Sequence, residues 1–203
     1  MRTLIIALFC VSAILVSPTS WGQNLEITPF TGYTFASGFD ITGGRAKLEG
    51  NINWGLFLGY TPKRFIEWEI SYNFLGTQAT ATSVYLNEDV VSRAQLHFLM
   101  IGANRLIFIN EKLVFFSGLK VGSAGLSFPD DDFNALSKLS FGIQTGLKYK
   151  LTDRLGLRTQ ANLLLPIIDE GGSLWWNPNS GTSISGWSPI VPFSVNLGLV
   201  IRF

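Results

Sequence analysis

The sequence predicts an all-β fold: an eight-stranded antiparallel up-and-down transmembrane β-barrel with short periplasmic turns and long extracellular loops. Three observations predict it. Eight segments alternate apolar and polar residues, their apolar faces carry no charge, and their connections are short and long in turn. In hydrocarbon every backbone amide needs a partner within the protein, so alternating strands persist there only in a closed barrel. The alternation therefore predicts a membrane location together with the fold.

The alternation is clearest from Leu139 to Leu151. Successive side chains of a strand point to opposite faces. One face of this segment is apolar apart from Thr145, and the other carries Gln144 and Lys148 among small residues. Such a strand has one face suited to lipid and one suited to a polar interior.

Each predicted strand has at least the roughly 9 to 11 residues that a tilted membrane strand requires. The second strand has Trp54 and Leu56 on its apolar face, and the third has Trp68 and Ile70. The fifth has the weakest pattern, because Val114 and its neighbours place apolar groups on both faces. The eight predicted ranges are 25–36, 46–60, 65–76, 90–103, 113–122, 138–151, 155–165 and 190–203.

The connections between these strands alternate in length. The short ones are 61–64, 109–112 and 152–154, and the long polar ones are 37–45, 77–89, 123–137 and 166–189. All short turns then lie at the end that holds the termini, as in bacterial barrels. Outward aromatic residues gather toward both ends, as interfacial girdles do. They are Tyr60, Trp68, Tyr149 and Phe203 at the turn end, and Tyr33, Phe35, Phe74 and Phe193 at the loop end.

Residues 1–22 are expected to be a cleaved signal peptide, leaving residues 23–203 as one outer-membrane β-barrel domain. The apolar run 4–16 follows Arg2 and is shorter than the roughly 20 residues of a membrane-spanning helix. Cys10, the only cysteine, lies in this leader, so the mature chain has no thiol. Losing Arg2 leaves 14 of the 15 basic residues against 14 acidic ones, which gives no reason to expect nucleic acid as a partner. We expect no cofactor and no metal site.

The last strand, IVPFSVNLGLVIRF, ends on an aromatic residue after alternating apolar ones. Together with EITPFTGYTFA (26–36) and RTQANLLLP (158–166), it resembles the small OmpA/OmpX-type family, the outer-membrane protein β-barrel domain. The resemblance implies a location in the cell outer membrane, contact with its lipid and lipopolysaccharide, and recognition of Phe203 by the barrel assembly machinery. It implies little about activity, because family members differ chiefly in their loops.

The inward faces are predicted to carry a charge network with a structural role. Eight strands enclose only enough space for their own side chains, so these charges should pair across the axis. Glu26, Gln95 and His97 are also expected to face inward. The predicted network consists of Lys47, Glu49, Glu67, Glu69, Arg93, Lys120, Lys148, Arg158 and Arg202.

Three classes of function remain open at this point. We favour a structural or surface-interaction protein with a plugged polar lumen, and the alternative is a narrow ion or small-solute channel. A lipid-modifying enzyme is a distant third. The paired Glu67 and Glu69 could serve acid–base chemistry, but basic neighbours favour salt bridges. Lipid A deacylases use a histidine and a serine two residues later, whereas Leu99 follows His97 here, so we expect no enzyme.

The long loops contain two further candidates. PDDDFN (129–134) has consecutive acids but lacks the ligand spacing and glycine turn of calcium loops, which favours a solvated tip. Trp175, Trp176 and Trp187 lie in the fourth loop, and exposed tryptophans often anchor an extracellular ligand. Packing over the barrel mouth is the other explanation. A soluble lipocalin-like barrel would invert the polarity, and the strand lengths and loop asymmetry count against it.

Overall fold

The computed structural model describes residues 24–41, 44–83, 90–127, 136–166, 174–177, 181–184 and 191–203. The predicted signal peptide, the PDDDFN segment and Trp187 lie outside these residues. Within them, no helix is long and apolar enough to cross a membrane.

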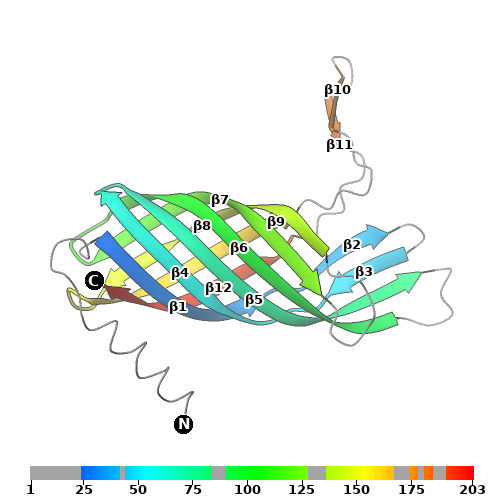
Figure 1. Ribbon diagram of the computed structural model, residues 1–203, viewed down its shortest axis with the longest axis horizontal. Coiled ribbons are helices and arrows are strands. Elements are labelled where there is room, and N and C mark those ends of the chain that lie inside the picture. Colours follow the sequence, from blue (N-terminus) through cyan, green and yellow to red (C-terminus); the bar gives the residue numbers. More distant parts are fainter. Residues whose placement is uncertain are drawn as a thin grey trace, which may run out of the picture.

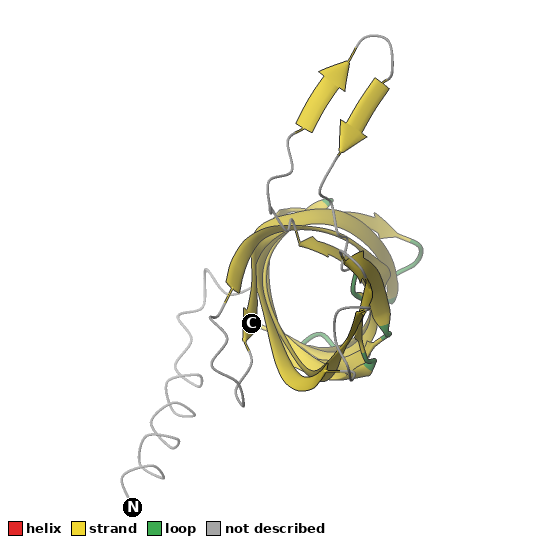
Figure 2. Ribbon diagram, turned by 90° about the vertical axis from the view of Figure 1, so that its right-hand side faces the viewer, coloured by secondary structure: helices red, strands yellow, loops and turns green. Residues whose placement is uncertain are grey.

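The described chain forms a closed antiparallel β-barrel, which Figure 1 shows from the side and Figure 2 along its axis. The order around the barrel is β1, β4, β5, β6, β7, β8, β9 and β12, and β12 pairs with β1 to close the ring. Closure places Ile27 opposite Ile201 and Tyr33 opposite Val195. The predicted eight-stranded up-and-down barrel is therefore confirmed.

Two short strands continue barrel strands beyond an interruption, so the eight barrel strands comprise ten segments. β2 follows β1 after Phe35 and Ala36, and β3 precedes β4 before Glu49 and Gly50. The barrel segments are β1 Leu25–Thr34, β2 Ser37–Ile41, β3 Gly44–Leu48, β4 Asn51–Lys63, β5 Ile66–Ser83, β6 Val90–Phe108, β7 Leu113–Ser127, β8 Leu136–Lys150, β9 Leu155–Pro166 and β12 Phe193–Arg202. β10 Leu174–Asn177 and β11 Gly181–Ile184 form a separate two-stranded ladder.

The turn end and the loop end differ as predicted, but the strands at the loop end are longer than expected. Three short turns lie at the turn end, at 64–65, 109–112 and 151–154. At the other end, β5 continues to Ser83 and β7 to Ser127, so much of each predicted loop is strand. The alternation of apolar and polar residues is required only where the strands face lipid. The hydrogen-bonded pairing of the strands continues beyond that region, because backbone hydrogen bonds do not require lipid.

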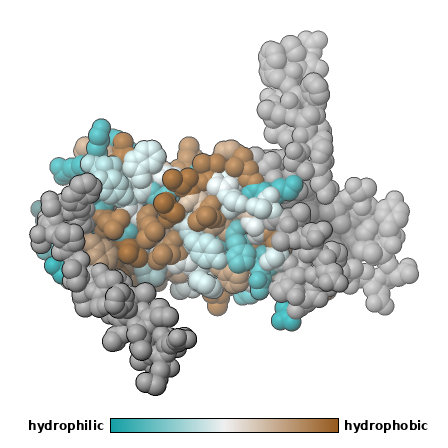
Figure 3. All heavy atoms as spheres, viewed as in Figure 1, coloured by the Kyte–Doolittle hydropathy of each residue, from teal (hydrophilic) through white to brown (hydrophobic). Residues whose placement is uncertain are grey.

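A belt of apolar side chains surrounds the barrel, and Figure 3 shows it as the brown middle zone of one face. Ile143 on β8 is 49% exposed and Leu197 on β12 is 54% exposed, while their inward neighbours Gln144 and Asn196 are almost fully buried. An exterior of this extent is stable only in contact with hydrocarbon. The predicted outward faces of β4, β5, β8 and β12 are confirmed by this exposure pattern.

Aromatic rings mark both edges of the belt. At the loop end Phe35 lies 5.3 Å from Tyr33 and 5.5 Å from Phe193 between ring centroids. At the turn end Phe65 and Phe108 lie 6.3 Å apart, and the guanidinium of Arg105 lies 5.2 Å from the Phe65 ring. Such rings and cations suit the lipid–water interface.

Candidate functional site

The lumen is the part of the molecule where polar and charged groups converge. In its turn-side half, Glu67 and Glu69 project from β5 and Arg158 from β9, and all three are at least 98% buried. Their position follows from the strand period of two, which places both glutamates on the inward face of β5. Buried charges of this kind are stable only when they are paired.

Glu69 is the most fully bonded carboxylate of the lumen. Its Oε2 accepts a hydrogen bond from Arg158 Nη2 at 2.5 Å and one from Asn104 Nδ2 at 3.0 Å. Its Oε1 accepts one from Gln144 Nε2 at 3.0 Å. Four strands, β5, β6, β8 and β9, are thus joined across the axis by one carboxylate.

A second group lies nearer the turn end. Lys148 donates to both Glu26 and Glu67. Arg202 Nε donates to Glu26 Oε1 at 2.8 Å, and Asn104 Nδ2 donates to Glu67 Oε1 at 3.0 Å. These bonds connect the first and last strands of the barrel to β5, β6 and β8.

The guanidinium of Arg158 lies between two aromatic rings. Its Cζ is 4.5 Å from the centroid of Phe57 and 4.3 Å from that of Phe116. A cation over an aromatic face is attracted by the ring quadrupole, especially away from water. Gly146 makes room for one ring, because a Cβ there would lie 2.7 Å from Phe116 Cζ.

Lys120 lies above this group and has a neutral partner. Its Nζ donates to Asn162 Oδ1 at 3.0 Å and lies 5.7 Å from the centroid of Phe57. Asn162 also accepts a hydrogen bond from Gln160, which itself donates to Gln144 Oε1 at 2.6 Å. The amide side chains therefore connect Lys120 with the carboxylates below.

The loop-side half of the lumen contains an apolar cluster beside buried polar side chains such as Thr34, Asn53 and Thr77. We call this buried cluster the apolar plug; it comprises Leu48, Leu75, Ala94, Leu96, Phe98, Met100, Ala124 and Leu164. Along β5 the chain passes from Glu69 to Leu75 as it leaves the turn end, so the plug lies on the loop side of the charges. The expected polar lumen is therefore interrupted on the loop side by an apolar cluster from β3, β5, β6, β7 and β9.

Several buried polar atoms of the lumen have no protein partner within the described residues. They include Asn53 Oδ1, Asn73 Oδ1 and both amide atoms of Asn196. Buried polar groups that lack a protein partner are commonly bound by ordered water.

Three residues of the predicted network lie elsewhere, and their placement is a correction. Lys47, Glu49 and Arg93 are exposed. The strand is interrupted at Glu49 and Gly50, so Leu48 joins the apolar plug and its charged neighbours face away from the lumen. The structure brings the other six predicted residues together: Glu67, Glu69, Lys120, Lys148, Arg158 and Arg202.

The predicted orientation of β6 is wrong. Ala94, Leu96, Phe98 and Met100 face inward, whereas Gln95 and His97 belong to the outward face. His97 Nδ1 is 2.9 Å from the hydroxyl of Tyr72, which is also outward. Arg93 pairs with Gln78, beyond Phe74, the last outward aromatic residue of β5. Its charge therefore lies past the apolar belt and does not indicate which face is inside.

Asn104 is a network residue that the sequence reasoning missed, because the predicted strand ended at residue 103 whereas β6 continues to Phe108. It donates to Glu67 and Glu69 and accepts from Gln144 Nε2 at 2.5 Å. The signal was present: within the lipid-crossing part of β6, Asn104 is the one amide among apolar and small residues from Phe98 to Asn104.

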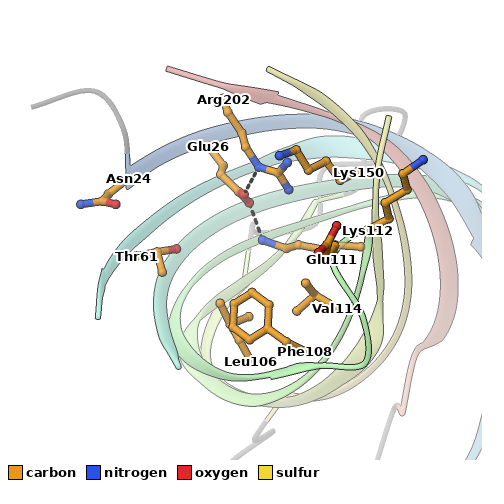
Figure 4. A pocket seen from close by; sticks show the side chains of 11 residues that line it. Asn24, Glu26, Thr61, Leu106, Phe108, Glu111, Lys112, Val114, Lys150 and Arg202 are labelled. Carbon is orange, nitrogen blue, oxygen red and sulfur yellow. Dashed lines mark hydrogen bonds and ion pairs between the residues drawn. The ribbon is translucent and has the colours of Figure 1, made fainter. Parts of the chain in front are cut away.

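The turn end of the lumen opens into a cavity of about 300 Å³, which we call the turn-side pocket (Figure 4). Glu26 and Arg202 line one side, Leu106, Phe108 and Val114 line the other, and Lys148 also lines the cavity. Lys112 and Lys150 lie at its rim. Lys150 lies 2.6 Å from Asp153 in the adjoining turn and holds the pKa of that carboxyl below its usual range.

Two of the three loop tryptophans and the terminal aromatic residue belong to the described part of the chain. Trp175 and Trp176 belong to β10, paired with Ser183 and Thr182 of β11. The backbone nitrogen of Phe203 donates to Leu25 O at 3.1 Å, which ties the end of the chain to β1. Within the described residues, no cluster of three or more metal-binding side chains occurs.

No family model matches the sequence. No curated protein matches it either.

Solved structures share the fold. The outer membrane protein OprG from Pseudomonas aeruginosa is 10% identical with a TM-score of 0.61, over 90% of this chain and 97% of that one. The Neisserial surface protein A is 11% identical with a TM-score of 0.59, over 88% and 97%. AlkL, an outer membrane protein solved in DMPC bilayers, is 14% identical with a TM-score of 0.51, over 93% and 94%. The fold is thus that of OmpA/OmpX-type outer-membrane barrels, as the sequence resemblance implied.

Proposed function

We propose that this chain is an integral outer-membrane barrel that does not conduct and that holds its loops at the cell surface in a structural or interaction role. The observation that carries the proposal is the filled lumen. The charge network occupies the turn-side half and the apolar plug occupies the loop-side half. An apolar constriction resists the entry of water and ions, and the paired charges beneath it are held by bonds from six strands.

The outer-membrane location is supported by several independent features. The apolar belt requires lipid, the predicted leader at residues 1–22 would direct export, and the solved structures with this fold are outer-membrane proteins. In that membrane the belt would contact lipid and lipopolysaccharide, and Phe203 would serve the barrel assembly machinery.

Conductance of the purified barrel in planar bilayers tests the proposal. We expect the conductance to stay at the level of the lipid bilayer alone after insertion of the barrel has been verified. Steady conductance above that baseline would support the second candidate, a narrow channel. The channel is favoured by the turn-side pocket and by the buried amide oxygens of Asn53, Asn73 and Asn196, which have no protein partner among the described residues and suit water.

The surface role is tested at the fourth loop. If Trp175 and Trp176 anchor an extracellular ligand, Trp175→Ala with Trp176→Ala should abolish binding of whole cells to that ligand while leaving the amount of barrel in the membrane unchanged. Candidate ligands can be screened as immobilised host proteins and glycans. Unchanged binding of the double variant to every ligand that the wild type binds would exclude the tryptophans from this role.

A further inference from the structure

We infer that the turn-side pocket binds a small amphipathic monoanion, a carboxylate carrying a short apolar tail. The inference goes beyond the proposed function, because it does not depend on whether the barrel conducts. It rests on the charge of the pocket, on the presence of one charged wall and one apolar wall, and on the volume of the cavity.

Cations outnumber carboxylates in the pocket. Lys112, Lys148, Lys150 and Arg202 line it together with Glu26 and Glu111. Lys148 pairs with Glu26 and with the buried Glu67, and Arg202 pairs with Glu26. An excess of positive charge in a partly enclosed site attracts anions, because the surrounding low dielectric strengthens the interaction.

Two of these cations have donor capacity to spare among the described residues. Arg202 uses only Nε on Glu26, so its two terminal nitrogens remain available, and its side chain is 23% exposed at the mouth. The ammonium of Lys112 has no hydrogen bond or ion pair with the described residues around it. A guanidinium fork and an ammonium together suit a carboxylate.

The other wall gives the ligand an apolar part. Leu106, Phe108 and Val114 face the cavity from the side opposite Glu26 and Arg202 (Figure 4). The volume of about 300 Å³ lies at the lower end of small-molecule sites. Glu26 and Glu111 would repel a multiply charged ligand such as phosphate. A short-chain carboxylate can contact the cations of one wall and the apolar side chains of the other, and its single negative charge is repelled less by the two glutamates.

The test is an NMR titration of the full mature barrel in zwitterionic nanodiscs, with hexanoate as the probe. We expect saturable shifts of the Leu106 and Val114 methyls and of the Lys112 amide. Acetate and inorganic phosphate should bind at least about tenfold more weakly, since acetate lacks the tail and phosphate meets the glutamates. Hexylammonium should produce no saturable shift at these groups. Empty nanodiscs correct for partition of each probe into lipid.

Variants identify the groups responsible. Lys112→Gln with Lys150→Gln should weaken hexanoate binding about tenfold or more, because the pair of changes removes the charge-assisted contact of Lys112 and a second positive charge beside the pocket. Lys63→Gln, an exposed lysine at the same end and outside the pocket, should leave it unchanged. Heat-modified gel mobility confirms that each variant is folded.

The inference is overturned by any of three results: hexanoate shifts that do not saturate, equal binding of acetate and hexanoate, or unchanged affinity in the folded double variant. None of these results bears on conductance, so failure here and failure of the proposed function are distinguishable.

Discussion

Glu69 has the most extensive set of partners in the lumen. It receives hydrogen bonds from Arg158, Asn104 and Gln144, each on a different strand. A buried charge that loses its partner costs more than the pair contributed, because the remaining ion has no solvent. Arg158, at only 2% exposure, is the group most dependent on this carboxylate.

At this scale we predict that Glu69→Gln lowers the free energy of unfolding by roughly 3 to 5 kcal/mol, since it leaves the Arg158 charge undercompensated. Urea denaturation of the barrel in lipid vesicles, followed by tryptophan fluorescence, measures the change. The matched control is Glu49→Gln, which removes an exposed carboxylate and should change stability by about 0.5 kcal/mol or less. Equal effects of the two substitutions would rule out a structural network around Glu69.

The polar residues of β6 do not indicate which of its faces lies inside the barrel. Its outward face carries Arg93, Gln95, His97 and Arg105, and its inward face is mostly apolar. Arg93 and Gln95 lie beyond the apolar belt, and Arg105 lies over the ring of Phe65 at the opposite edge. Within the belt only His97 is strongly polar, and the Tyr72 hydroxyl satisfies one of its nitrogens.

The neighbours Phe98 and Leu99 test this orientation, because one lies in the plug and the other faces lipid. We predict that Phe98→Ala lowers the free energy of unfolding by about 3 to 5 kcal/mol, as cavities in packed interiors do. Leu99→Ala should cost much less, because lipid fills the space that the side chain leaves. Urea midpoints of the two variants give the comparison, and a larger loss for Leu99→Ala would mean that β6 is the other way round.

Sequence reasoning was most successful where polarity and position agree. The outward faces of β4, β5, β8 and β12 could be predicted because their outward central residues are apolar almost throughout and carry no charge, as from Ile66 to Phe74. β6 could not, since its charges lie outside the belt and its central residues are apolar on both faces. Leu48 could not either, because the interruption at Glu49 and Gly50 breaks the period of two. The contacts between Glu69 and Arg158 depend on the stagger of strands far apart in sequence, which alternation does not encode.

At the scale of the whole molecule, the barrel has the charge network in its turn-side half and the apolar plug in its loop-side half. Both are held by one closed sheet, since β12 pairs with β9 on one side and β1 on the other. β10 and β11 pair only with each other and not with the barrel sheet. The fourth loop is therefore not required to close the ring.

We predict that replacing residues 167–190 with a short Gly-Ser linker leaves the barrel able to fold. The register from Phe193 opposite Leu163 to Ile201 opposite Leu155 is complete without these residues. Refolding into lipid vesicles, read as the heat-modified shift on gels, checks this. Loss of the folded band in the shortened chain would show that the loop contributes to closure.

Paramagnetic broadening of methyl signals from the unmodified protein in nanodiscs tests most directly which side chains face lipid and which lie inside the barrel. Doxyl-labelled lipid should broaden Leu99, Ile101, Ile143 and Leu197, which face outward. The methyls of Leu75, Leu96, Met100 and Leu164 should escape both this lipid and an aqueous gadolinium chelate, because they form a dry plug inside the barrel. Broadening of the plug methyls by the chelate would contradict a dry plug. Broadening of these methyls by the lipid label as strongly as that of the outward methyls would contradict their position inside the barrel.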